Sequence, residues 1–375
     1  ICHEALAAFA AFATMKIFLA GDYDGGRYWA NIVRAMTKKL RGMAKSNMNM
    51  ETHAHLLLHV AVDIWFQPPK EISQNMITYH HNAMKMGQVH IAEAALGVSC
   101  RYLLLGGENL SLLQQLYDDK FRLVAKHSKS FVAKYMALDS ILLTELTGKS
   151  GDYFSVFNGS ICNIDDLKDE AKATKDLSLL QSCHVFNVLI NYWRGNYMAA
   201  EEHSRLASMM YPACKEPTIY LIYHTFYRAL ILFKRHRISG SIVGSANNKL
   251  KDGKEMMDLM GRWSLLSKNV FNNKWLLLKA EYAASVEKFD EALQMYKDSI
   301  KSAQDHGNIQ ELALAHELLG DYYSDRGCHL VSIECFKNGY LYYTQWGATA
   351  IAERILRKHN LDVDIFEVQN RKHSR

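Results

Sequence analysis

The chain has 375 residues, of which 49% are hydrophobic and 22% charged, so it can bury a large core and wholesale disorder is excluded. Its formal net charge is +5, but 44 basic residues are spread among 39 acidic ones. The densest basic runs, 38–41 and 234–237, fall near expected helix ends. We therefore expect no nucleic-acid partner, because such binding needs basic side chains gathered on one face.

The scarcity of proline predicts a helical chain. Only 4 prolines are present, against roughly 19 at average usage, and proline is excluded from helix interiors. Apolar residues at helical spacing predict helices at residues 3–20, 23–43, 49–66, 73–86, 89–106, 109–127, 130–147, 163–176, 179–194, 197–211, 217–236, 246–261, 271–286, 289–306, 308–326, 329–345 and 347–358.

A loop rich in glycine, serine and asparagine at 148–162 has the weakest helical pattern. It divides the chain into N-terminal helical-hairpin repeats at 1–147 and C-terminal repeats at 163–358. Residues 359–375 turn polar and are expected to form a tail or linker.

One turn pattern recurs along the chain. A turn residue, a polar residue and a larger residue are followed, three places on, by a small residue, at 21–26, 87–92, 195–200, 287–292 and 327–332. The last two of these turns lie 40 residues apart, and other turns of the chain fit intervals of about 40–47 residues. That period is the one of helical hairpin repeats. The small residue near the start of the returning helix would let two backbones approach closely.

Neither of the last two hairpins can hide its apolar stripe alone, so neighbouring hairpins must stack. The sequence thus predicts an all-α fold: an α-solenoid, or superhelix, of about eight antiparallel hairpins with a C-terminal capping helix. The expected structural repeat positions are Gly21, Tyr23, Gly26, Gly195, Tyr197, Ala200, Ala280, Ala292, Tyr296, Leu319, Gly320, Tyr323, Gly327, Trp346 and Gly347.

The 7 cysteines are odd in number and form no Cys-x-x-Cys pair, which favours a reducing compartment over a disulfide framework or a thiolate zinc site. The apolar segment 5–15 has no basic leader, and the stretch 220–233 is too short to span a bilayer. We expect no membrane span. The chain begins at Ile1 rather than methionine, from which we expect it to be a fragment of a longer protein.

Motifs for catalysis are weak. Gly148-Lys149-Ser150 matches the end of a phosphate-binding loop, but Leu143 stands where the motif needs its opening glycine, so a helix-ending turn is favoured. His3-Glu4 resembles only the start of a histidine-kinase phosphoacceptor box. We expect no catalytic residue and no bound cofactor in this segment.

Histidines gather near residue 55. His55 and His59 lie one helical turn apart, with His53 and Asp63 nearby, and His80-His81 follow. A zinc site needs three or four converging ligands, and two histidines on one face are more often packing residues. We therefore expect no metal site.

Aromatic residues recur near hairpin ends and have two interpretations. They line a peptide groove on the concave face of the solenoid, or they pack as wedges between adjacent helices. The second is favoured. The residues concerned are Trp193, Trp275, Trp346, Tyr340, Tyr342 and Tyr343.

The last two hairpins carry a specific resemblance. The segments 275–281, 292–303, 306–318 and 343–348, the last reading Tyr-Thr-Gln-Trp-Gly-Ala, resemble the tetratricopeptide-type helical region of very large signalling proteins. Those proteins join a serine/threonine-kinase-like domain, an AAA-type ATPase, this helical region, a GAF domain and a sensor histidine kinase. The resemblance is strong over about 262–350 and looser before it. Glu287 stands where a plain tetratricopeptide repeat favours glycine.

The resemblance implies a non-catalytic protein-interaction and signal-relay segment that couples a nucleotide-binding domain to an output kinase. ATP would bind in neighbouring domains of the parent protein. Partners would be other proteins or adjacent domains of the same chain, in the cytoplasm.

Two alternatives stay open. One is a free-standing tetratricopeptide adaptor that binds a partner peptide in its concave groove. The other is an enzyme whose metal is held by His53, His55 and His59.

Overall fold

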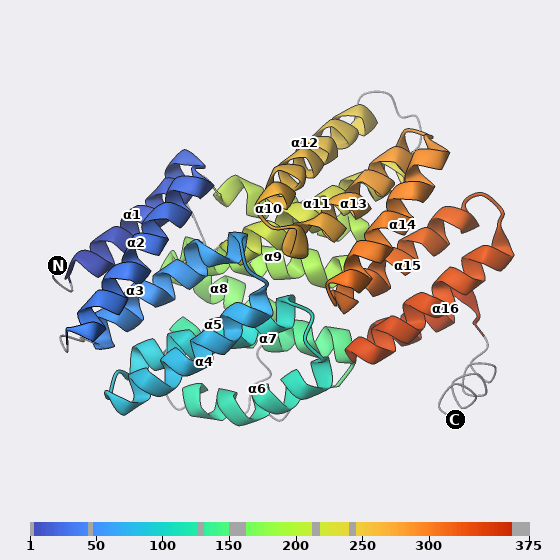
Figure 1. The fold of residues 1–375 in the computed structure, drawn as a ribbon. Coiled ribbons are helices and arrows are strands. Elements are labelled where there is room, and N and C mark those ends of the chain that lie inside the picture. Colours follow the sequence, from blue (N-terminus) through green and yellow to red (C-terminus); the bar gives the residue numbers. More distant parts are fainter. Residues whose placement is uncertain are drawn as a thin grey trace, which may run out of the picture.

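The computed structural model describes residues 4–43, 48–125, 131–149, 163–211, 218–239 and 245–361. Over these ranges the chain folds into seventeen α-helices and one 3-10 helix, with no strand (Figure 1). The expected all-α class is confirmed. None of these helices is both long and apolar enough to cross a membrane.

The helices follow one another with short connections between most of them. They are α1 (Glu4–Ala20), α2 (Tyr23–Gly42), α3 (Met48–Ala61), η1 (Asp63–Trp65), α4 (Pro69–Lys85), α5 (Val89–Leu105), α6 (Leu110–Ala125), α7 (Phe131–Thr147), α8 (Ile164–Thr174), α9 (Leu177–Trp193), α10 (Tyr197–Met210), α11 (Thr218–Ser239), α12 (Ser245–Leu266), α13 (Lys268–Ser285), α14 (Phe289–Asp305), α15 (Ile309–Ser324), α16 (His329–Trp346) and α17 (Thr349–His359).

Three bounds differ most from those expected, each for a physical reason. α4 begins at Pro69 rather than at residue 73, because proline is tolerated in the first helical turn. The helix expected at 49–66 ends early and is followed by η1, whose Trp65 packs against Trp263 at 4.9 Å between ring centroids. α12 continues to Leu266, beyond the expected end at 261, and this added turn contains Trp263, which is buried against Trp65.

Residues in the left-handed backbone conformation stand between several paired helices. Gly195, with φ +78°, follows α9 two residues before α10 begins. Glu287 adopts the same conformation between α13 and α14, with φ +59°. A residue with a Cβ pays roughly 1–2 kcal/mol for this conformation, so Glu287 is a strained exception to the glycine rule.

The small residue that follows each turn is buried where the two helices approach. A Cβ at Gly26 would lie 2.5 Å from Cγ1 of Ile17, so only glycine fits there without movement. The other four small residues are at most 3% exposed: Ala92, Ala200, Ala292 and Ser332. Close helix approach therefore depends on side-chain size at this position.

The helices before residue 148 pack against those after residue 163. α7 contacts α8, α9 and α17, and α3 contacts α11. In Figure 1 the C-terminal end of α16 lies beside α7, although almost two hundred residues separate them in sequence. We call this contact region the seam.

Side-chain donors bind backbone carbonyl oxygens across the seam. Trp346 donates its Nε1–H to Glu108 O at 3.0 Å, and Asn109 donates from Nδ2 to Gln345 O at 3.1 Å. Tyr223 donates its hydroxyl to the carbonyl of Leu105, the last residue of α5. These bonds satisfy carbonyls at helix ends and turns, which have no partner within a helix.

Two buried aromatic clusters lie near the seam: the first is formed within the C-terminal helices, and the second crosses the seam. Trp193 of α9 contacts Tyr227 of α11 and Tyr343 and Trp346 of α16, with ring centroids 5.7–6.2 Å apart. The second cluster joins Tyr23 and Trp65 to Trp263 and Phe271. Trp193, Tyr343 and Trp346 therefore wedge helices together, and Trp275, Tyr340 and Tyr342 are half-buried.

A fully buried ion pair lies where α5, α7 and α11 meet. Arg101 of α5 donates from Nε and Nη2 to the two carboxylate oxygens of Asp139 of α7, both at 3.1 Å. The guanidinium also lies 5.1 Å from the ring centroids of Tyr135 and Tyr220. Burial raises the pKa of Asp139, and the Arg101 charge opposes that rise.

Replacing Glu287 by glycine is expected to stabilise the protein by about 1 kcal/mol, because glycine adopts positive φ without strain. Urea unfolding followed by circular dichroism measures the change. The matched control is Asp290→Gly in the first turn of α14, which should destabilise by up to about 1 kcal/mol. Equal effects of the two substitutions would contradict the assignment of strain to Glu287.

Removing one partner of the Arg101–Asp139 pair is expected to cost about 3–5 kcal/mol, because the other charge stays buried alone. Asp139→Leu and Arg101→Met each test this by urea unfolding. The double variant removes both charges and should recover most of the loss. A double variant less stable than both single variants would show that the pair itself supplies the stability.

Candidate functional site

The repeat positions expected from the sequence are spread through the fold and form no single site. Four glycines have positive φ in turns: Gly21, Gly195, Gly327 and Gly347. Eight positions are buried between helices: Gly26, Ala200, Ala280, Ala292, Tyr296, Leu319, Gly320 and Trp346. Three are half-buried: Tyr23, Tyr197 and Tyr323. All of them serve turns or packing.

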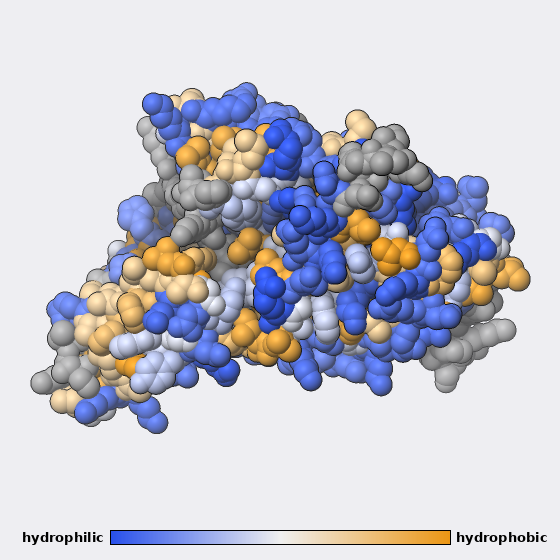
Figure 2. All heavy atoms as spheres, turned by 90° about the horizontal axis from the view of Figure 1, so that it is seen from above, coloured by the Kyte–Doolittle hydropathy of each residue, from blue (hydrophilic) through white to orange (hydrophobic). Residues whose placement is uncertain are grey.

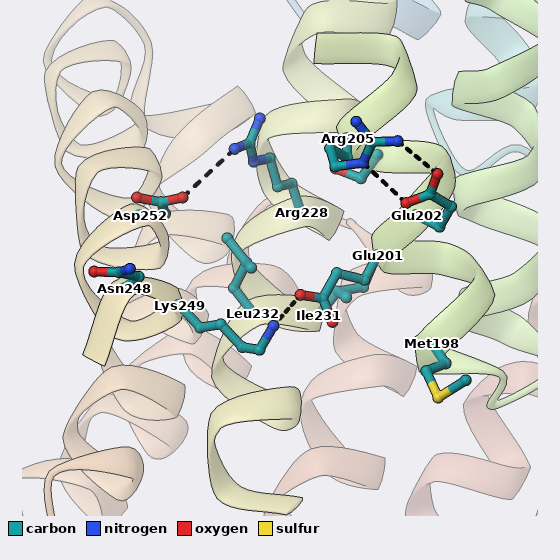
Figure 3. Close-up of a pocket in the computed structure, with 11 residues that line it drawn as sticks. Met198, Glu201, Glu202, Arg205, Arg228, Ile231, Leu232, Asn248, Lys249 and Asp252 are labelled. Atoms are coloured by element: carbon teal, nitrogen blue, oxygen red, sulfur yellow. Dashed lines mark hydrogen bonds and ion pairs between the residues drawn. The ribbon is translucent and has the colours of Figure 1, made fainter. Parts of the chain in front are cut away.

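A cleft lies between α10 and α12, which both pack on α11. It has a volume of about 580 Å³ and is open to solvent on one side (Figure 3). The residues that line it are Met198, Glu201, Glu202, Ser204, Arg205, Arg228, Ile231, Leu232, Asn248, Lys249 and Asp252. Sequence reasoning identified none of these as functional, because no motif marks residues that meet from three helices.

The cleft combines an apolar floor with charged walls. Ile231 and Leu232 of α11 form the floor, and Met198 stands at the rim with 68% of its surface exposed. Figure 3 shows Lys249 of α12 reaching across the cleft to Glu201 of α10. Arg235 of α11 holds the same carboxylate at 2.9 Å.

Each charged side chain in the walls has a partner of opposite charge. Partial burial acts to raise the pKa of Glu201, but its ion pairs with Lys249 and Arg235 outweigh this and hold the pKa below the usual value. Glu202 binds Arg205 at 2.7 Å, and Asp252 lies 3.8 Å from Arg228. The exposed pair of Glu202 and Arg205 contributes only about 0–1 kcal/mol, so a ligand with its own charges could exchange with it at low cost.

A serine and a histidine meet beneath the cleft in a contact that superficially resembles a nucleophile and its base. Ser204 Oγ lies 3.0 Å from Nε2 of His224. Burial, followed by the nearby Arg228 charge, lowers the pKa of His224 to about 3. A histidine with so low a pKa is a poor proton acceptor at neutral pH, so this contact is better suited to packing than to catalysis.

Three of the histidines considered for metal binding, His55, His59 and His80, have other partners, and His53 is exposed. His59 Nδ1 lies 2.5 Å from Oδ2 of Asp63, and His55 Nε2 lies 3.1 Å from Oγ1 of Thr37. His80 Nδ1 contacts the carbonyl of Ala92. Among the residues that the structure describes, no three His, Cys, Asp or Glu side chains are grouped so that they could hold a metal ion.

The remaining sequence motifs fall at helix ends. Gly148 and Lys149 directly follow α7, and Gly148 has φ +69°. Ser150 and His3 lie outside the described residues, whereas Glu4 begins α1. Cys100, Cys183, Cys328 and Cys335 are free thiols.

Comparison of the chain with models of protein families gives no match, and comparison with curated proteins gives none either.

Three buried histidines make the fold sensitive to acid. Burial is the main cause that lowers the pKa of His55 and His184 to about 4 and that of His224 to about 3. Unfolded histidine binds a proton below about pH 6.5, so the stabilisation is complete above that pH. It is lost as the pH falls through about 6.5 toward 4, at a cost of roughly 3 kcal/mol or more in total.

Urea unfolding at pH 7.5, 6.0 and 5.0 measures this loss. His224→Gln should show a shallower dependence on pH than the unmodified protein. A free energy of unfolding that does not change between pH 7.5 and 5.0 would contradict the prediction.

Proposed function

We propose that this chain is a non-catalytic protein-interaction and signal-relay segment of a multidomain signalling ATPase/histidine kinase. In this proposal the helices form a tetratricopeptide-like solenoid of about eight antiparallel hairpins, capped by α17. Support comes from the short turns with left-handed residues, the small buried residues after them, and the resemblance over about 262–350.

The seam is the observation that carries the relay. Because α7 contacts α17 and Trp346 binds the carbonyl of Glu108, the last helices are joined to the middle of the chain. A domain that pulls or packs on the C-terminal helices would then change the contacts of α7. Well-packed interfaces switch between discrete arrangements rather than deforming continuously, which suits a segment that transmits a signal.

In the proposed parent protein, this segment couples a nucleotide-binding domain to an output kinase in the cytoplasm. ATP binds the neighbouring domain, and the segment itself holds no cofactor. Its partners are adjacent domains or separate signalling proteins.

The cleft favours a second candidate, an adaptor that binds a partner peptide. Leu232 at the floor of the cleft and the exposed pair of Glu202 and Arg205 in its wall could contact an extended segment that carries apolar and charged residues. The adaptor expected from the sequence used aromatic residues of a concave groove, but Trp193 and Trp346 are buried between helices. The cleft is therefore the better place for such a peptide.

The relay is tested on the full-length protein that contains this chain. Trp346→Phe removes the seam hydrogen bond to Glu108 while keeping an aromatic ring, and is expected to change the rate of ATP hydrolysis about fivefold or more. The matched control is Trp275→Phe, which leaves the seam intact and should have little effect. A parent protein without a nucleotide-binding domain, or equal effects of the two variants, would reject the relay.

The adaptor is tested separately by peptide-array binding to the purified chain. Lys249→Glu places two like charges across the cleft and should abolish binding of any peptide seated there, whereas Lys279→Glu, on α13, should not. Peptide binding with no effect of Lys249→Glu would exclude the cleft as the site.

A further inference from the structure

One ion pair of the cleft between α10 and α12 is too long for a hydrogen bond. Nη2 of Arg228, on α11, lies 3.8 Å from Oδ2 of Asp252, on α12. Figure 3 shows the two side chains pointing toward one another from these helices. The Arg228 side chain is 25% exposed and the Asp252 side chain 49% exposed. Both groups therefore offer donors or acceptors that a ligand in the cleft can reach.

The guanidinium of Arg228 is held from its other side. Its Nη1 donates a hydrogen bond to Oγ of Ser208, on α10. Ser208 in turn donates to the carbonyl of Ser204 at 2.8 Å. The Arg228 side chain is thus oriented before any ligand arrives, and a group that is already ordered loses little conformational entropy on binding.

The other charged groups of the cleft have closer partners. Glu202 accepts two hydrogen bonds from Arg205, and Glu201 accepts hydrogen bonds from Lys249 and Arg235. Three basic and three acidic side chains line the cleft, so their charges cancel. A ligand that carries one positive and one negative charge keeps this balance, whereas a ligand with a net charge does not.

A small apolar surface lies next to Arg228. Leu232, one helical turn further along α11, lines the cleft together with Met198, which is 68% exposed. Methionine adapts its shape to different apolar groups. Figure 2, which views the molecule from the side where Figure 1 shows α12, presents a mostly hydrophilic face with small, separate hydrophobic patches. The apolar part of a ligand in this cleft is therefore expected to be a single side chain.

We propose that the cleft binds a free α-amino acid with an apolar side chain such as that of leucine or methionine. Its carboxylate binds Arg228, its ammonium group binds Asp252, and its side chain packs on Leu232 and Met198.

An α-amino acid matches the pair because both of its charged groups are attached to one carbon atom. They lie about as close together as the charges of Arg228 and Asp252 do. A carboxylate accepts parallel hydrogen bonds from a guanidinium, and an ammonium group donates up to three. An internal peptide segment has neither charge on its backbone and matches the pair less well. The cleft volume of about 580 Å³ is within the usual range for small-molecule sites.

This proposal goes beyond the relay and the adaptor and depends on neither. The bound amino acid would contact α10, α11 and α12 at once, so it gives the segment a ligand to sense. A peptide array without any binder would reject the adaptor and leave the amino-acid site unaffected.

Isothermal titration calorimetry of the purified chain with L-leucine tests the site. Three analogues separate the contributions: leucinamide lacks the carboxylate, isocaproate lacks the ammonium group, and glycine lacks the apolar side chain. L-leucine should bind at millimolar concentration or below, and each analogue at least about tenfold more weakly. No binding of L-leucine or L-methionine overturns the proposal, and so does an analogue that binds as well as L-leucine.

Substitutions place the amino acid in the cleft. Asp252→Asn keeps the size of the side chain but removes its charge, and it should weaken the binding of L-leucine at least about tenfold. Arg228→Gln should do the same. The matched control is Asp258→Asn, at an exposed residue of the same helix, which should leave the dissociation constant unchanged. Circular dichroism shows whether each variant is folded. Binding of L-leucine that survives Asp252→Asn, or that is weakened equally by the control, overturns the proposal.

Discussion

The buried pair of Arg101 and Asp139 is the constraint around which the other helices are placed. Its charges are out of water, so each needs the other at hydrogen-bonding distance, and α5 and α7 are fixed relative to one another. The rings of Tyr135 and Tyr220 on either side extend this requirement to α11. Because α11 also contacts α9, α10, α12 and α13, the ion pair lies beside the helix that has contacts with much of the C-terminal half.

The packing of the N-terminal helices against the C-terminal helices produces two different regions, the buried seam and the open cleft. At and beside the seam, Trp193 and Trp346 are buried between helices, so they do not line a concave peptide groove. Away from the seam, α10 and α12 both pack on α11, and the ion pair of Glu201 and Lys249 lies at the cleft between them. The proposed relay depends on the first surface and the proposed adaptor on the second, which is why variants at Trp346 and Lys249 separate them.

The helices and their turns were predictable because local features determine them. Few prolines, apolar stripes and a small residue after each turn act within one hairpin, and Gly26 and Ala292 are buried as that logic requires. Neither the seam nor the cleft was predictable. Trp346 and Glu108 are distant in sequence, and Lys249 meets Glu201 from another helix. No periodicity of the sequence predicts contacts between such distant residues. The contact of Trp65 with Trp263 also accompanies helix ends that differ from those expected for α3 and α12.

The contact between α7 and α17 changes how this chain should come apart. An open array of repeats, in which each hairpin touches only its neighbours, loses structure piece by piece from its ends. Here the last described helix contacts α7, an element from the first half of the chain, so the C-terminal end is held by more than its neighbour in sequence. Fraying of α17 would uncover α7 as well, and melting is therefore expected to be a single concerted transition rather than a graded unravelling.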